Sequence, residues 1–122
     1  MTSDAAPVAG RPAPIQPWDV LIVPFPFAER DAEKRRPALA LSTTEFVRET
    51  GTVVVAMITS AAHRAWPGDV PITDLRHAGL ASACVVRWKV ATRDVRLVIR
   101  KAGSLSARDR KAAAQAMRRV MG

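Results

Sequence analysis

Short apolar runs separated by prolines and turn residues constrain this chain more than any other feature of its sequence. The run at 52–59, Thr-Val-Val-Val-Ala-Met-Ile-Thr, is rich in β-branched residues and nearly continuous in hydrophobicity. That pattern is typical of a central strand buried on both faces. We expect the other strands at 19–25, 37–42, 69–72, 83–90 and 96–101. Short strands this closely spaced predict a mainly β domain, a small barrel or sandwich.

Prolines and polar residues indicate where the strands end. Pro24 and Pro26 interrupt and follow the first apolar run, which favours a strand at the edge or the end of a sheet. Residues 28–35 are expected to form a charged loop, and Thr92-Arg93-Asp94 a turn or a single helical turn. The chain is therefore expected to reverse direction at these places.

The C-terminal part of the chain changes to a helical period. Ser106-Ala107-Arg108-Asp109 has the spacing of a capping box, which predicts a helix beginning after Ser106. The apolar face of this helix would consist of Ala113, Ala116, Met117, Val120 and Met121. The opposite, polar face would consist of Arg108, Lys111, Gln115 and Arg118. The pattern predicts a helix lying on the barrel, with a basic stripe that is either solvated or in contact with RNA.

Composition divides the chain into a tail and one domain. Residues 1–17 are rich in Pro, Ala, Ser and Gly, which predicts a disordered tail, so the domain is expected at 18–122. The single cysteine, Cys84, allows neither an intrachain disulfide nor a Cys-rich metal site. No apolar stretch approaches the roughly 20 residues of a membrane span, and the N-terminus lacks the pattern of a secretory signal. We therefore expect a cytoplasmic protein that uses no membrane, cofactor or metal.

The net charge of +8 is concentrated in the last part of the chain. Residues 1–86 hold eight Lys or Arg against nine Asp or Glu, whereas residues 87–122 hold eleven against two, a net charge of +9 for that segment. A lopsided basic field attracts polyanions and speeds their association. The expected partners are nucleic acid, an acidic protein, or both in competition; the alternative is a merely solubilising surface.

Several blocks of the sequence occur in the order and spacing of one protein family. They include Trp-Asp-Val-Leu-Ile-Val-Pro-Phe-Pro-Phe at 18–27, Lys-Arg-Arg-Pro-Ala-Leu-Ala-Leu-Ser at 34–42, and the segments 56–60, 66–70, 78–80, 84–87 and 96–106. Together they resemble the MazF/PemK family of toxin ribonucleases from Trp18 to about Met121. One departure is Trp18 itself, because the family usually has Gly there, and a ring at this position is expected to alter the groove and the choice of substrate.

The resemblance implies an SH3-like β-barrel with a C-terminal α-helix, acting as a homodimer. It also implies sequence-selective cleavage of single-stranded RNA by a toxin of a type II toxin–antitoxin system. The partner implied is a cognate antitoxin whose acidic segment lies across the active groove and which links the toxin to operator DNA.

Arg36 is the residue expected to carry the chemistry. Metal-independent RNA cleavage uses the neighbouring 2′-hydroxyl as nucleophile, and a guanidinium fork suits the charged phosphorane that forms. Pro37 restricts the backbone of Arg36 to extended geometry, and the family resemblance points to the same position. The alternative is an ordinary surface cation beside Lys34 and Arg35, which are themselves candidates for RNA binding. Asp19 either orients Arg36 through a charge-assisted pair or caps a turn.

Thr59 is the second catalytic candidate because it ends the central strand, where a hydroxyl can face a groove. There it would donate to a phosphate oxygen, and in the family a Thr at this place accompanies the Arg. The alternative is a strand-end hydrogen bond to a neighbouring loop. Ser60 is a further candidate for phosphate contact.

The loop after Ser60 carries further candidates for RNA binding. His63 is a candidate general base, since an unperturbed imidazole titrates near neutrality, or else it faces solvent. Trp66 either stacks on a base or covers the barrel end or the dimer seam. Arg64 lies in the same loop, and Arg87 is expected to contact either the RNA backbone or a second protomer.

These residues predict an endoribonuclease that leaves 2′,3′-cyclic phosphate and 5′-hydroxyl ends. The alternative is a non-catalytic SH3-like module that binds nucleic acid or antitoxin and serves transcriptional autoregulation. A third possibility, a peptide-binding adaptor, is disfavoured by an aromatic content of 5% and the lack of Tyr. The sequence has no Gly-rich phosphate loop with Lys-Ser/Thr, no His-Glu-x-x-His, no paired Asp cluster and no nucleophile elbow.

Overall fold

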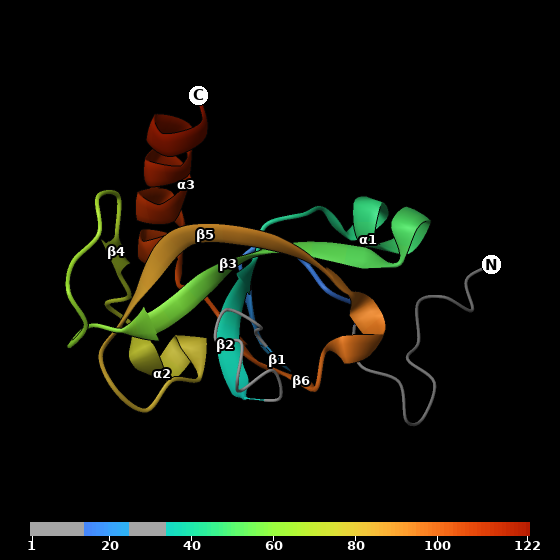
Figure 1. Ribbon diagram of the computed structural model, residues 1–122, viewed down its shortest axis with the longest axis horizontal. Helices are drawn as coiled ribbons and strands as arrows, with labels where there is room; N and C mark the ends of the chain where they lie inside the picture. The colour runs from blue at the N-terminus through green and yellow to red at the C-terminus, as the bar shows by residue number, and fades with distance from the viewer. Residues whose placement is uncertain (1–13, 25–33) are drawn as a thin grey trace.

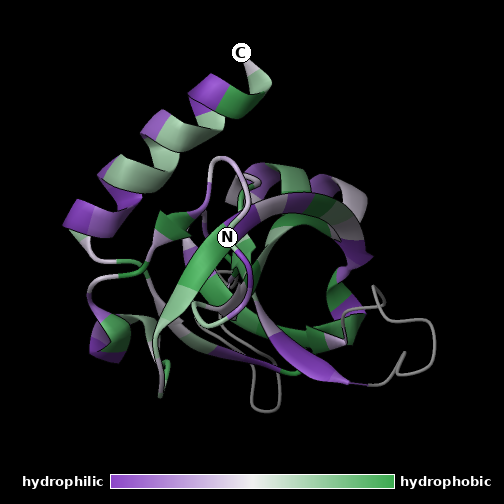
Figure 2. Ribbon diagram, turned by 60° about the vertical axis from the view of Figure 1, so that its left-hand side comes forward, coloured by the Kyte–Doolittle hydropathy of each residue, from purple (hydrophilic) through white to green (hydrophobic). Residues whose placement is uncertain are grey.

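A six-stranded antiparallel sheet forms the body of the protein. The computed structural model describes residues 14–24 and 34–122, and the structural statements below concern these residues. The elements are β1 (Asp19–Pro24), β2 (Arg35–Ala40), α1 (Thr44–Thr50), β3 (Thr52–Ser60), β4 (Val70–Pro71), α2 (Leu75–Ala78), β5 (Cys84–Asp94), η3 (Val95–Leu97), β6 (Arg100–Ser104) and α3 (Ala107–Met121). The strands follow the order β4-β5-β3-β2-β1-β6, and the sheet curls into a half-barrel from which α3 projects (Figures 1 and 2). The predicted mainly β fold with a C-terminal helix is confirmed.

Strand β3 is the central strand that its β-branched run predicts. It pairs with β2 on one side and with β5 on the other, from Thr52–Asp94 to Ser60–Cys84. The β3–β5 register shifts between Ala56 and Met57, and an irregularity of this kind bends and twists the paired strands. The bend contributes to the curl of the sheet seen in Figure 2.

Strand β2 occupies 35–40 where 37–42 was expected, and the ends of β5 and β6 also differ from the prediction. Strand β5 continues through Thr92, Arg93 and Asp94, so the turn expected there is wrong; pairing with β3 holds these residues extended. The chain turns instead in η3, where the Asp94 carboxylate accepts a hydrogen bond from the Arg96 amide. The strand expected at 96–101 consequently begins only at Arg100, where it pairs with Ile22.

Strand β1 is an interior strand, whereas its prolines favoured an edge or an end. It pairs with both β2 and β6, and Pro24 is its last paired residue, opposite Arg35. Because Pro24 is the last residue of β1, its missing N–H does not interrupt the hydrogen bonds within the sheet. Strand β1 can therefore lie between two other strands. Phe25, Pro26 and most of the charged loop expected at 28–35 lie outside the described residues.

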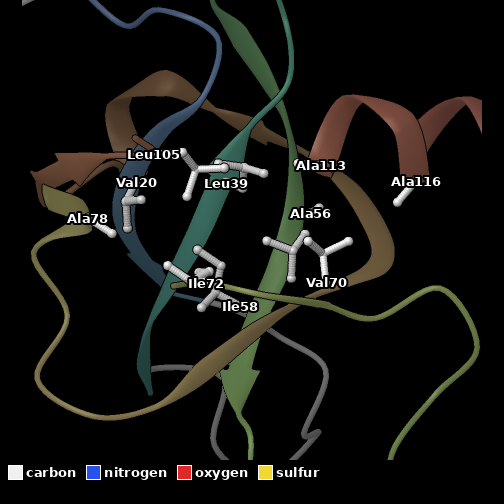
Figure 3. Close-up of a cluster of buried hydrophobic side chains, with 11 residues drawn as sticks. Val20, Leu39, Ala56, Ile58, Val70, Ile72, Ala78, Leu105, Ala113 and Ala116 are labelled. Atoms are coloured by element: carbon white, nitrogen blue, oxygen red, sulfur yellow. The ribbon is translucent and has the colours of Figure 1, made fainter. Parts of the chain in front are cut away.

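Side chains alternate across the curled sheet and form two separate hydrophobic clusters. The first lies between the sheet, α2 and α3, with branched side chains from three neighbouring strands at its centre (Figure 3). The second lies on the other face and includes Val53, Val55 and Met57 of β3 and Ala38 and Ala40 of β2. Because both faces of β3 are buried, its nearly continuous hydrophobicity is explained.

Packing begins before the expected boundary at Trp18. Ile15 is only 6% exposed and belongs to the second cluster, and its carbonyl accepts a hydrogen bond from the Thr44 hydroxyl. The C-terminal residues of the predicted tail are therefore part of the packed domain, because an apolar side chain there finds a pocket beside α1. Residues 1–13 of that tail lie outside the described residues.

Two short helices follow from capping signals that the periodicity analysis passed over. Thr43 caps α1 by accepting from the Phe46 amide, and Gly51 ends it in the left-handed conformation. Asp74 caps α2 and Gly79 ends it in the same way. Both follow the asymmetry of polar N-caps and C-terminal glycines.

The C-terminal helix begins where the sequence predicts. The Ser106 hydroxyl accepts from the Asp109 amide, and Ala113 and Ala116 are buried on the predicted apolar face. Val120 and Met121, also predicted on that face, are about half exposed because the last turns of α3 extend past the sheet (Figure 2).

Asp109 ties this helix to the segment between β4 and α2. Its carboxylate is 2% exposed and accepts from the amides of Thr73 and Asp74 and from the Thr73 hydroxyl, at 2.7–3.1 Å. Burial alone would raise the pKa of Asp109, but these hydrogen bonds outweigh it and hold the pKa below its ordinary value.

Trp18 adopts a backbone conformation that favours glycine. Its φ is 74°, and it is the one described non-glycine residue with positive φ. The conformation is fixed from both sides, since Trp18 N–H donates to the Ala40 carbonyl and Trp18 C=O accepts from the Leu105 amide. The ring packs against the first cluster, so its contacts oppose the backbone strain of about 1–2 kcal/mol.

At position 18 we expect glycine to give a more stable protein than alanine, the reverse of the usual order of stability for these two residues. Both W18A and W18G remove the ring contacts, but only W18G relieves the left-handed backbone. We expect W18G to be more stable than W18A by about 1 kcal/mol, measured by urea unfolding. Equal stabilities, or the ordinary preference for Ala, would contradict the argument.

Replacing Asp109 should give a pH-dependent loss of stability. D109N removes one acceptor oxygen and sets an NH2 group against donors, which should cost about 2 kcal/mol at pH 7. Because the folded pKa is lowered, the carboxylate contributes fully above about pH 4 and progressively less as the pH falls through that folded pKa. Unfolding of wild type and D109N should therefore converge in acid, whereas E45Q, at an exposed first-turn carboxylate of α1, should change stability little at either pH.

Candidate functional site

The candidate site lies where the pairing of β2 with β3 stops. The paired residues end at Ala38–Met57, directly beside Pro37, which has no N–H to extend the ladder. Continuing the same register places Arg36 opposite Thr59. Because side chains two residues apart share a face, both belong to the face that carries Ala38 and Met57 in the second cluster. The sheet thus brings an arginine and a threonine together at an opening between two strands.

A cavity of about 290 Å³ occupies this opening. Of the ten residues expected to form the site, six line it together: Lys34, Arg35, Arg36, Thr59, Ser60 and His63. Within residues 14–24 and 34–122, the Arg36 guanidinium makes no ion pair. The cavity is therefore a cationic pocket with a hydroxyl and an imidazole in its wall.

Thr59 and His63 contact each other in this wall. The distance between Thr59 Oγ1 and His63 Nδ1 is 2.9 Å, and Thr59 is 6% exposed. The hydrogen bond to a neighbouring loop, expected as an alternative for Thr59, therefore exists. The Ser60 hydroxyl accepts from the Ala62 amide at 3.1 Å, which holds the first turn of that loop.

Arg87 is bonded to other residues of this chain, and its expected contact with RNA or with a second protomer stays a prediction. Its guanidinium is buried, donates to both carboxylate oxygens of Asp69 at 3.1 and 2.9 Å, and donates to the Arg64 carbonyl at 2.8 Å. The Arg87 hydrogen bonds lower the pKa of Asp69 against the opposing effect of burial. These three groups, which we name the loop clamp, fix the loop that carries His63 and Trp66.

Trp66 and Arg64 lie outside the cavity lining. The Trp66 ring is 45% exposed, with Lys89 Nζ 4.4 Å and Arg87 Cζ 5.4 Å from its centroid. It is thus held by cation–π contacts beside the loop clamp. An exposed ring surface remains, so base stacking by Trp66 stays a prediction.

Asp19 does not pair with Arg36. Its buried carboxylate accepts from the Gln16 amide at 2.8 Å and lies 3.1 Å from Lys101 Nζ. The hydrogen bond from Gln16 is the turn cap that was expected as the alternative for Asp19. The ion pair with Lys101 is an additional contact, which forms because β6 pairs with β1. Trp18 likewise does not line the cavity, so its ring gives no reason to expect an altered groove.

Residues that the sequence analysis missed complete the wall. Leu80, Ala81, Ser82 and Cys84 line the side opposite β2. Cys84 is the register partner of Ser60, so only the β3–β5 pairing could have revealed it. Burial raises the pKa of the Cys84 thiol, which keeps it neutral near pH 7.

The described part of the chain contains neither a metal-binding cluster nor a membrane-spanning helix. No three His, Cys, Asp or Glu side chains within residues 14–24 and 34–122 are grouped so that they would hold a metal ion. No helix within the same residues is long and apolar enough to cross a bilayer.

The fold and the site define a small half-barrel protein with a cationic cavity at the end of its central strand. Residues 16–121 match the family described as PemK-like, MazF-like toxin of type II toxin-antitoxin system. The chain belongs to this family, which confirms the resemblance. Comparison with curated protein sequences finds no match.

Solved structures with this fold are similar over most of the chain. Mycobacterium tuberculosis toxin MazF-mt6 is 29% identical with a TM-score of 0.62, covering 81% of this chain and 91% of that one. A MazE-MazF structure from Deinococcus radiodurans is 21% identical with a TM-score of 0.68, covering 90% and 97%. An endoribonuclease in complex with its cognate antitoxin from a mycobacterial species is 18% identical with a TM-score of 0.69, covering 90% and 96%.

Breaking the loop clamp should destabilise the protein. R87Q leaves Asp69 as a half-buried carboxylate without its partner, which should cost about 2–3 kcal/mol in the free energy of unfolding. R96Q is the matched control, because the Arg96–Asp94 pair is exposed and should contribute almost nothing. Chemical denaturation of both variants tests this; similar effects of R87Q and R96Q would contradict a structural clamp.

Proposed function

We propose that this toxin is an endoribonuclease that cleaves single-stranded RNA at the cavity between β2 and β3, without a metal. The observation that carries the proposal is the presence of Arg36 and Thr59 in the wall of one cationic cavity. The fold neighbours described as endoribonucleases support the same activity.

In the proposed reaction the 2′-oxygen of the RNA attacks the adjacent phosphorus, and the bond from phosphorus to the 5′-oxygen breaks. The 2′-oxygen loses its proton and the 5′-oxygen gains one, which gives a 2′,3′-cyclic phosphate and a 5′-hydroxyl. Arg36 would donate two parallel hydrogen bonds to the non-bridging oxygens as their charge grows. Thr59, in β3, would donate a third hydrogen bond to the phosphate. All three donors would then be in place before the negative charge develops.

Lys34 and Arg35 would bind the neighbouring phosphates of the same strand. Both are exposed and line the rim beside Arg36. Their attraction for a polyanion has no sequence preference, so they supply affinity rather than specificity. The same field suits an acidic antitoxin segment, and the neighbours solved with an antitoxin support this partner. A homodimer and operator DNA reached through the antitoxin belong to the same proposal, as does a cytoplasmic location.

Replacing Arg36 should abolish cleavage without unfolding the protein. R36A removes the proposed phosphorane ligand and should lower the rate at least 100-fold, in line with the loss of one preorganised donor. R36K keeps the charge but loses the fork, and should fall between R36A and wild type. R48A, on the exposed surface of α1, is the matched control and should cleave normally.

The measurement is cleavage of a mixed-sequence RNA in EDTA, with end-group analysis and circular dichroism of each variant. Wild-type cleavage by folded R36A would contradict the site. An intact RNA with wild-type protein would instead favour the non-catalytic binding module, and loss of cleavage in EDTA alone would contradict metal independence.

A further inference from the structure

The contact between Thr59 and His63 determines which way the Thr59 proton can point. A hydroxyl has one proton, and Thr59 Oγ1 lies 2.9 Å from His63 Nδ1. If Nδ1 is unprotonated, Thr59 donates to it and has no proton left for a phosphate. If Nδ1 carries a proton, the ring donates to Oγ1 and the Thr59 proton is free to bond a phosphate oxygen. A doubly protonated imidazolium allows only the second arrangement.

His63 is held in this position from both sides. Its amide donates to the Ser60 carbonyl at 3.2 Å, and the Ala62 amide donates to the Ser60 hydroxyl. On the other side, the Arg64 carbonyl accepts from Arg87 in the loop clamp. The loop backbone on both sides of His63 is therefore braced, and the exposed imidazole is held to Thr59 by its Nδ1 contact.

From these contacts we propose that His63 is a positioning residue that directs the Thr59 hydroxyl toward an RNA phosphate, and that RNA binding strengthens when His63 is protonated. The inference rests on the proposed function only in taking RNA as the ligand of the cavity. His63 need not touch the RNA, because it acts through Thr59.

Several other charged or titratable groups line the cavity with His63 or lie next to it. Lys34, directly before β2, and Arg35 and Arg36 in β2 line the same cavity as His63, and Arg64 follows it in the loop. Cys84, on β5, stays neutral because burial raises its thiol pKa. Imidazole is the side chain whose charge most often changes near neutral pH. A pH dependence of binding that is lost in H63N would therefore report the protonation of His63. By linkage, bound phosphate would in turn favour protonation of His63.

The first test measures binding of a 2′-O-methylated oligoribonucleotide, which cannot be cleaved, by fluorescence anisotropy at constant ionic strength. For wild type we expect the Kd to rise about fivefold from pH 5.5 to pH 8. The rise follows because neutral His63 no longer forces the Thr59 hydroxyl to donate to the phosphate. H63N places a permanent amide donor near Thr59 and should give a flat profile. H77N is the matched control, since His77 binds the Ser104 carbonyl away from the cavity, and it should keep the wild-type profile.

The second test asks whether His63 acts through Thr59. T59V keeps the shape of Thr59 and removes its hydroxyl, so its pH profile should be as flat as that of H63N. In cleavage assays at pH 8, H63N should retain more of kcat than H63L, because only the amide can still donate to Thr59. An unchanged profile in H63N, or an undiminished pH dependence in T59V, would overturn the inference. If wild type binds as expected but never cleaves, the proposed function fails while the positioning role stands.

Discussion

The pairing of β3 with its two neighbours is the constraint on which the rest of the structure depends. With β5 it is paired along its whole length, and this ladder forms the wall against which both hydrophobic clusters pack. With β2 it is paired only as far as Ala38–Met57, because Pro37 cannot donate the next hydrogen bond. The same strand that fixes the core therefore also leaves the opening in which Arg36 and Thr59 meet.

The distribution of charge in the sequence does not coincide with the distribution of available charge in the fold. Residues 87–122 carry the excess of positive charge, yet Arg87, Arg96 and Lys101 are engaged by Asp69, Asp94 and Asp19. The cations that line the cavity come from 34–36, in the part of the chain with no net positive charge. The Arg87–Asp69 and Lys101–Asp19 pairs join segments that only the fold brings together, whereas Arg96–Asp94 is local. Net charge therefore did not indicate which cations would line the cavity.

Local signals were enough to predict much of the fold and several of the residues that line the candidate cavity. The β-branched run ending at Thr59, the cap at Ser106 and the Arg36–Pro37 pair act through neighbouring residues, and the structure keeps all three. The roles of Asp19 and Arg87 depend on partners 82 and 18 positions away, Lys101 and Asp69, which periodicity cannot identify. Helix α1 was predictable only in part. Its N-cap and its C-terminal glycine are local signals, but its seven residues are too few to show a helical period.

The three consecutive cations at the cavity rim repel one another. None of Lys34, Arg35 and Arg36 pairs with a carboxylate of the described residues, and a proton on His63 would add to the repulsion. Any polyanion that fills the cavity relieves the repulsion, whether it is the phosphate backbone of RNA or an acidic segment of an antitoxin. The two proposed ligands would thus be recognised by one physical property of the site, because the Arg36 fork can bind either a carboxylate or a phosphate. They would differ in their own chemistry, since only the RNA carries a 2′-oxygen beside a phosphorus that it can attack.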